Sequence, residues 1–228
     1  MVALQQFAAA SDHHELATSK LILLGFSGTG SLVARLAGYS PDRVSAVIAT
    51  DPGHFDPLGV DTINLSTQAA AIPQLILVGS ADAISGTRRP YAYFRKYFDR
   101  GSSWTFVVQN KTPHCCIMNA KVLMLDWLDA VVIHPPAAPS AARFGFIATV
   151  PSDTMDCPTP FPPASPVWCR STRDSWNEAN WSVSRTTVGR HRDGPDGMIP
   201  AGWLPSQKFA TEWKAFVSLP EHPVTSLP

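Results

Sequence analysis

Four short apolar segments, separated by stretches with helical spacing, restrict what the first part of this chain can fold into. They are Lys20–Gly25, Val44–Thr50, Gln74–Gly79 and Trp104–Gln109. Strands that are apolar throughout are buried on both faces, which is typical of a parallel sheet covered by helices. The sequence therefore predicts an α/β fold with a mostly parallel sheet of about four strands and flanking helices.

Proline content divides the chain into two parts. Residues 1–134 hold 6 of the 21 prolines, and residues 135–228 hold the other 15. The boundary at His134-Pro135-Pro136 reads as a stiff linker. We predict a core over residues 1–134 and a loop-rich, Pro- and Trp-rich extension over 135–228 that packs on the core. Within the extension we expect a strand at Phe144–Val150 and a helix at Ser206–Phe216.

Charge and composition exclude several kinds of partner. The 228 residues carry no net formal charge, and no basic run alternates with aromatics, so we expect no nucleic-acid partner. No apolar stretch approaches the roughly 18 residues of a membrane-spanning helix. Residues 1–19 lack the pattern of a signal peptide, which leaves the localisation open. The sequence does not indicate an oligomeric state.

A glycine-rich turn joins the first strand to the helix that follows it. Its sequence is Gly25-Phe26-Ser27-Gly28-Thr29-Gly30. This strand–turn–helix context is the one that a nucleophile elbow requires, with Ser27 as the nucleophile. The N–H of Gly28, at the start of the helix, is then an oxyanion donor. A phosphate-binding loop is the alternative, but neither the dinucleotide nor the Walker pattern is present.

An acid and a histidine follow later strands in the order that a triad on this fold takes. Asp82 comes just after Gln74–Gly79, and His114 just after Trp104–Gln109. Open α/β sheets place their sites at these carboxyl ends of strands. We therefore expect Ser27, Asp82 and His114 to form a catalytic triad. Asp51, directly after Val44–Thr50, is the alternative acid.

With these motifs in place, residues 1–133 resemble the C-terminal two-thirds of an α/β-hydrolase of the esterase, lipase and dienelactone-hydrolase kind. The resemblance implies hydrolysis of a small-molecule or polymeric carboxylic ester through an acyl-enzyme, without a cofactor. Ser27 is then the nucleophile, His114 the general base and acid, and Asp82 its orienting partner. Acyl transfer to an alcohol on the same triad is an alternative.

The chain departs from this family before the elbow. Only about twenty residues precede the elbow, whereas the family has several strands there and a loop that supplies the second oxyanion donor. We expect an exposed sheet edge at the first strand and a truncated chain. A catalytically impaired hydrolase or a binding remnant is therefore a further alternative. For the full-length parent protein we expect a location outside the cytoplasm, and a secretion signal, if the parent has one, would lie in the absent segment.

The cysteines and histidines give weaker signals. Cys157 and Cys169 flank a proline-rich loop, and a disulfide between them would stabilise the fold by roughly 3 kcal/mol. Two free thiols are the alternative. Neither the cysteines nor His13-His14-Glu15 show metal-ligand spacing, so we predict no metal site.

Overall fold

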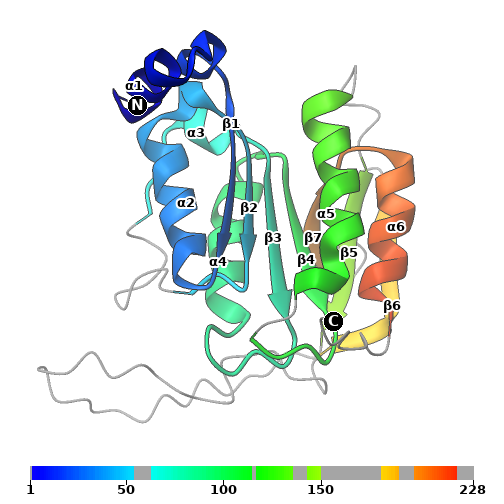
Figure 1. Cartoon of the computed structure of the whole chain (residues 1–228). Helices are drawn as coiled ribbons and strands as arrows, with labels where there is room; N and C mark the ends of the chain where they lie inside the picture. Colours follow the sequence, from blue (N-terminus) through cyan, green and yellow to red (C-terminus); the bar gives the residue numbers. More distant parts are fainter. Residues whose placement is uncertain are drawn as a thin grey trace, which may run out of the picture.

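The described part of the protein is built on one seven-stranded sheet (Figure 1). The computed structural model describes residues 2–53, 63–114, 117–135, 143–149, 181–189 and 198–219. The strand order is β1-β2-β3-β4-β7-β5-β6. The strands are β1 (Leu21–Phe26), β2 (Val44–Thr50), β3 (Gln74–Gly79), β4 (Trp104–Gln109), β5 (Arg143–Thr149), β6 (Trp181–Gly189) and β7 (Met198–Leu204).

Strands β1 to β4 are parallel, as the sequence predicts, and they form the α/β core. Three antiparallel strands from the extension continue the same sheet beyond β4. The join is the pair Thr105–Gly202. A Cβ at Gly202 would lie 2.7 Å from the Thr105 Cα, and its φ is +135°, so only glycine suits this position. In its described segments the extension is therefore more regular than its proline content suggests.

Helices connect the strands and cover the sheet. They are α1 (Val2–Ser11), α2 (Gly28–Tyr39), α3 (Thr67–Ala70), α4 (Arg88–Phe98), α5 (Lys121–Leu128) and α6 (Gln207–Val217), with 3-10 turns η1 (His14–Ala17), η2 (Pro41–Arg43) and η4 (Ile117–Ala120) and a π turn η5 (Asp129–Ile133). In Figure 1, α5 and α6 lie on one side of the sheet and α4 lies on the other. Helix α2 packs on β1 and β2.

Aromatic side chains fill the layer between α4 and the sheet. Tyr93 and Tyr97 pack against the Trp104 ring, with centroids 5.0 and 4.8 Å away. The Trp104 indole N–H is bonded to the Ile72 carbonyl at 3.0 Å. All three aromatic side chains are buried, so this layer fixes the side of the sheet on which α4 lies.

Helix α6 anchors the extension to the other side of the sheet. Ser206 caps the helix by accepting a hydrogen bond from the Phe209 N–H, at 3.0 Å. Trp213 is fully buried and donates its indole N–H to the Phe106 carbonyl of β4 at 3.0 Å. The predicted helix at Ser206–Phe216 is confirmed within one residue at each end.

The first strand keeps one face open. Ile22, Leu24 and Phe26 alternate along β1 and are 48%, 59% and 40% exposed. By the register of β1 to β4, these side chains lie on the same side of the sheet as α5 and α6. These two helices cover that side only over strands farther from β1. Within the described residues β1 pairs only with β2, so the expected exposed edge is found.

No helix among the described residues has both the length and the apolar character needed to cross a bilayer.

Candidate active site

The turn after β1 holds Ser27 in a strained backbone conformation. Its φ is 53° and its ψ is −124°, a backbone conformation that residues other than glycine rarely adopt. A Cβ at Gly25 would lie 2.3 Å from the Thr29 carbonyl oxygen, so the turn requires glycine two residues before the serine. The Thr29 hydroxyl is bonded to both the N–H and the C=O of Phe26, at 2.9 and 2.7 Å. These contacts give the sharp strand-to-helix turn that the motif predicts.

The end of β2 and the segment after it contact this turn through hydrogen bonds and close packing. The Ser27 N–H donates to the Thr50 carbonyl at 3.0 Å, and the Gly53 N–H donates to the Ser27 carbonyl at 2.9 Å. A Cβ at Gly30 would lie 2.5 Å from the Cβ of Pro52, so the helix can approach this segment only with glycine there. The end of β2 and the segment that follows it therefore hold the backbone of Ser27 in place.

The structure brings Ser27, His114 and Asp82 into one hydrogen-bonded chain. His114 Nε2 lies 2.9 Å from Ser27 Oγ, and His114 Nδ1 lies 2.8 Å from Asp82 Oδ2. The tautomer with the proton on Nδ1 satisfies both contacts, since Nδ1–H then donates to the carboxylate and Nε2 accepts from the serine hydroxyl. This is the geometry that transfers a proton from a serine to a histidine.

Backbone amides hold the Asp82 carboxylate in place. Its Oδ1 accepts hydrogen bonds from the N–H groups of Ile84 and Ser85, at 2.8 and 2.9 Å. Its Oδ2 remains for His114. The Asp82 side chain is fully buried and the His114 side chain is 10% exposed, so the contact between them is shielded from water.

Hydrogen bonds between the loops after β3 and β4 align the two residues. The Ser80 N–H donates to the Gln109 carbonyl at 2.9 Å, and the Lys111 N–H donates to the Ser80 hydroxyl oxygen at 2.8 Å. The two loops carry Asp82 and His114 at the carboxyl ends of adjacent parallel strands. Neighbouring strand ends are therefore the reason that residues 32 positions apart in sequence meet.

Phe26 is a contact that sequence reasoning missed. Its ring lies 5.1 Å from the His114 ring, centroid to centroid, at 33°. Because side chains alternate along a strand, Phe26 points to the open face of β1 while Gly25 faces α2. The position next to the serine was the available signal, but the sequence did not show which face His114 would reach.

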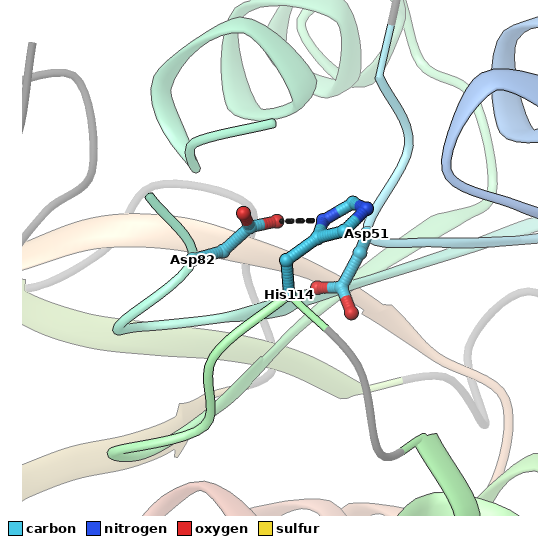
Figure 2. A group of neighbouring side chains, drawn as sticks. All are labelled: Asp51, Asp82 and His114. Atoms are coloured by element: carbon cyan, nitrogen blue, oxygen red, sulfur yellow. Dashed lines mark hydrogen bonds and ion pairs between the residues drawn. The ribbon is translucent and has the colours of Figure 1, made fainter. Parts of the chain in front are cut away.

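Asp51 lies beside the hydrogen-bonded chain of Ser27, His114 and Asp82 but is not part of it. One carboxylate oxygen of Asp51, one of Asp82 and one ring nitrogen of His114 lie within 4.8 Å of one another, and Figure 2 shows the three side chains gathered together. His114 Nδ1 is bonded to Asp82, so Asp82 has the place of the orienting acid. Asp51 Oδ1 accepts a hydrogen bond from the Gly79 N–H at 2.7 Å.

Burial raises the pKa of Asp51 from 3.8 to about 7. The Gly79 amide lowers the pKa, the nearby charge of Asp82 raises it, and His114 lowers it. The Asp51 residue is only 1% exposed. Asp51 thus carries a proton at acidic pH and loses it near neutrality, unlike an ordinary surface aspartate.

These three side chains also have the spacing of a metal-ligand group among the described residues. However, both ring nitrogens of His114 already take part in hydrogen bonds, to Asp82 and to Ser27. A metal ion would have to replace one of these contacts. The arrangement therefore suits proton transfer better than metal binding.

Gly28, the predicted oxyanion donor, lies at the start of the helix after the turn. Gly28 is the first residue of α2, and amides in the first turn of a helix have no acceptor within the helix. This is the position from which the predicted oxyanion donor would act. The predicted pair Cys157 and Cys169 lies outside the described residues.

The turn at Ser27 and the loops after β3 and β4 thus lie at the carboxyl ends of parallel strands. No protein-family model matches the sequence, and no curated protein matches it. Among solved structures, the chain is similar to the esterase PE8 at 18% identity and a TM-score of 0.45, covering 57% of each chain.

Two further solved structures are similar to a comparable extent. A predicted CIB-like hydrolase from Thermoplasma acidophilum is 19% identical, with a TM-score of 0.38, 54% of this chain and 55% of that chain covered. The monoacylglycerol lipase of Paleococcus ferrophilus is 19% identical, with a TM-score of 0.36, 55% of this chain and 73% of that chain covered. The chain spans a little over half the length of the first two structures.

Proposed function

We propose that this protein is a serine hydrolase that cleaves a carboxylic ester through an acyl-enzyme. Ser27 is the nucleophile, His114 is the general base and then the general acid, and Asp82 orients His114. The observation that supports this proposal is the hydrogen-bonded chain from Ser27 Oγ through the His114 ring to Asp82 Oδ2, at 2.9 and 2.8 Å.

Acylation begins with attack of Ser27 Oγ on the ester carbonyl carbon. The Oγ–H proton passes to His114 Nε2, and the carbonyl oxygen becomes an oxyanion. The Gly28 N–H donates to this oxyanion, and the N-terminus of α2 adds a favourable partial charge. Collapse of the intermediate breaks the ester C–O bond, and His114 returns the proton to the leaving alkoxide.

Deacylation repeats the sequence with water in place of serine. His114 takes a proton from water as the water oxygen attacks the acyl carbon, and the proton then returns to Ser27 Oγ. Asp82 keeps its charge throughout and stabilises the imidazolium form of His114. The reaction needs no cofactor, and either small-molecule or polymeric esters are suitable substrates.

Turnover of chromogenic esters tests this proposal. We expect the purified protein to release nitrophenol from nitrophenyl acyl esters, and Ser27→Ala to lose this activity. The Ser27→Ala variant is isosteric apart from the hydroxyl, so its background measures contamination and spontaneous hydrolysis. Turnover that is equal in both proteins would refute the proposal. Adding a competing alcohol and analysing the products separates hydrolysis from acyl transfer.

A non-catalytic binding protein is the second candidate, and the open face of β1 favours it. Ile22, Leu24 and Phe26 form an exposed apolar strip that suits a partner, and the Phe26 ring at its end lies beside His114. Among the described residues we assign one oxyanion donor, Gly28, and loss of one donor typically costs about 100–1000-fold in rate. A folded protein without turnover or serine labelling would support this candidate.

A further inference from the structure

A buried carboxyl group that the proposed triad does not use lies beside it. Asp51 follows β2 directly, with its backbone at a positive φ of 40°. Its N–H donates to the Leu77 carbonyl at 2.7 Å, and its Oδ1 accepts from the Gly79 N–H at 2.7 Å. A rigid backbone thus holds the Asp51 carboxyl between the end of β3 and the elbow, with 1% of the residue exposed.

The neighbours of Asp51 make its charge sensitive to the state of His114. The titratable side chains that act on it, in the part of the chain that the structure describes, are Asp82 after β3 and His114 after β4. From β1 and α2, the backbone of the Ser27 turn contacts the same segment through Gly53. Negative Asp82 opposes a charge on Asp51, and a positive His114 favours it.

We infer that Asp51 is a positioning residue for His114: its carboxyl group, once ionised, stabilises the imidazolium that forms when Ser27 gives up its proton. This inference rests on the proposed function. Opposite charges separated by less than about 5 Å attract even at the effective dielectric constant of a protein. Asp51 takes no proton from the substrate or from Ser27. It acts through its charge alone, which is absent at acidic pH and present at alkaline pH.

The pH dependence of the Asp51→Asn variant tests this role. Asparagine keeps the shape and the oxygen that accepts from Gly79, but it cannot ionise. We expect the ratio of wild-type to variant kcat/KM to rise from near unity at about pH 6 to about three- to tenfold at about pH 8. Asp42→Asn, which removes an exposed aspartate in η2, is the matched control, and its ratio stays constant.

A ratio for Asp51→Asn that does not change with pH would overturn the inference, because a purely structural role for Asp51 is independent of its charge. The ionisation of Asp51 can also be followed by protein stability, which requires no catalytic turnover. We expect the melting temperature of Asp51→Asn minus that of wild type to increase from about pH 4 to about pH 7 and to level off above that. If no protein shows turnover at any pH, the proposed function fails, while this melting difference still reports whether Asp51 ionises there.

Infrared spectroscopy of the wild-type protein tests the ionisation of Asp51 even if Asp51→Asn does not fold. Ordinary carboxyl groups ionise near about pH 4, so few protonated carboxyl groups remain above about pH 6. We expect an infrared band of a protonated carboxylic acid that persists at this pH and disappears through neutrality. Absence of such a band would overturn the inference.

Discussion

The hydroxyl of Thr29 closes the serine turn by bonding to both backbone groups of Phe26. It donates to the Phe26 carbonyl at 2.7 Å and accepts from the Phe26 N–H at 2.9 Å. Both groups belong to the residue just before Ser27, whose backbone is strained at a φ of 53°. The threonine two residues after Ser27 is therefore part of the turn, although a smaller residue is usual at this position of a nucleophile elbow.

Replacement of Thr29 by valine removes both hydrogen bonds without changing the size of the side chain. We expect Thr29→Val to lower the free energy of unfolding by about 1–2 kcal/mol, since each bond contributes about 0.5–1.5 kcal/mol. Urea unfolding measures this change. Thr29→Ser keeps the hydroxyl and is the control. Equal stability of the valine and serine variants would show that the hydroxyl does not support the turn.

The close approach at Gly25 gives a second test of the turn. Alanine at this position would place its Cβ 2.3 Å from the Thr29 carbonyl oxygen, a backbone atom that cannot rotate away. We expect Gly25→Ala to cost about 2–3 kcal/mol of stability and to misplace Ser27.

Gly38, in the helix α2 that follows the turn, is the control for Gly25. Its Cβ would meet only the end of the flexible Leu65 side chain, at 2.9 Å. Gly38→Ala is therefore expected to stay within about 1 kcal/mol of wild type, helped by the better helix propensity of alanine. Thermal unfolding compares the two variants, and a similar loss in both would contradict the proposed geometry of the turn.

The core strands could be predicted from the sequence because their signals are local. Val44–Thr50, Gln74–Gly79 and Trp104–Gln109 are continuous apolar runs, and the structure has strands with these same bounds. Parallel pairing places their carboxyl ends together, which made Asp82 and His114 candidates before any distance was known.

The remaining features depend on contacts between distant segments. The predicted strand at Phe144–Val150 is found as β5, one residue earlier at each end, but the place of β5 to β7 beside β4 depends on Gly202 and on the Trp213 indole bonded to the Phe106 carbonyl. Likewise, the position of Asp51 after β2 gave no sign of how deeply its carboxyl group is buried. Burial is set by the loops after β3 and β4, which the sequence of β2 does not encode.

The Asp82 carboxylate fixes the tautomer of His114, and its replacement should impair the chemistry rather than the fold. In Asp82→Asn, the amide oxygen can still accept from Ile84 and Ser85, but the NH₂ group faces His114 Nδ1 and favours the wrong tautomer. We expect kcat to fall by about 10³–10⁴-fold with little change in melting temperature. A loss below about tenfold would indicate that another group orients His114.

The ionisation of Asp51 should make the protein less stable as the pH rises. The folded-state pKa of about 7 lies above the unfolded value of 3.8, so between these pH values the folded chain keeps a proton that the unfolded chain releases. Stability then falls by about 1.4 kcal/mol per pH unit and levels off above the folded pKa.

Asp51→Asn lacks this loss, so its stability advantage over wild type should grow by about 3 kcal/mol between about pH 5 and about pH 8. Urea unfolding at both pH values measures the change. A constant difference between the two proteins would contradict the raised pKa of Asp51.

Trp213 tests the attachment of the extension to the core. Its side chain is fully buried between α6 and β4, and a Cβ at Gly145 of β5 would lie 2.6 Å from its ring. We expect Trp213→Ala to destabilise the protein by about 3–5 kcal/mol in chemical unfolding. Trp213→Phe keeps part of the packing but loses the bond to Phe106, so an intermediate loss is expected. No loss for either variant would mean that α6 does not pack on β4.

Covalent labelling of Ser27 by a fluorophosphonate, located by peptide mass spectrometry, tests the central claim most directly. The probe reacts with a serine whose hydroxyl is activated by a neighbouring base and whose product oxyanion is stabilised. The account predicts one adduct on the peptide that contains Ser27, lost in Ser27→Ala and strongly slowed in His114→Ala. Folded wild-type protein that remains unlabelled, or an adduct on another residue that persists in Ser27→Ala, would contradict it.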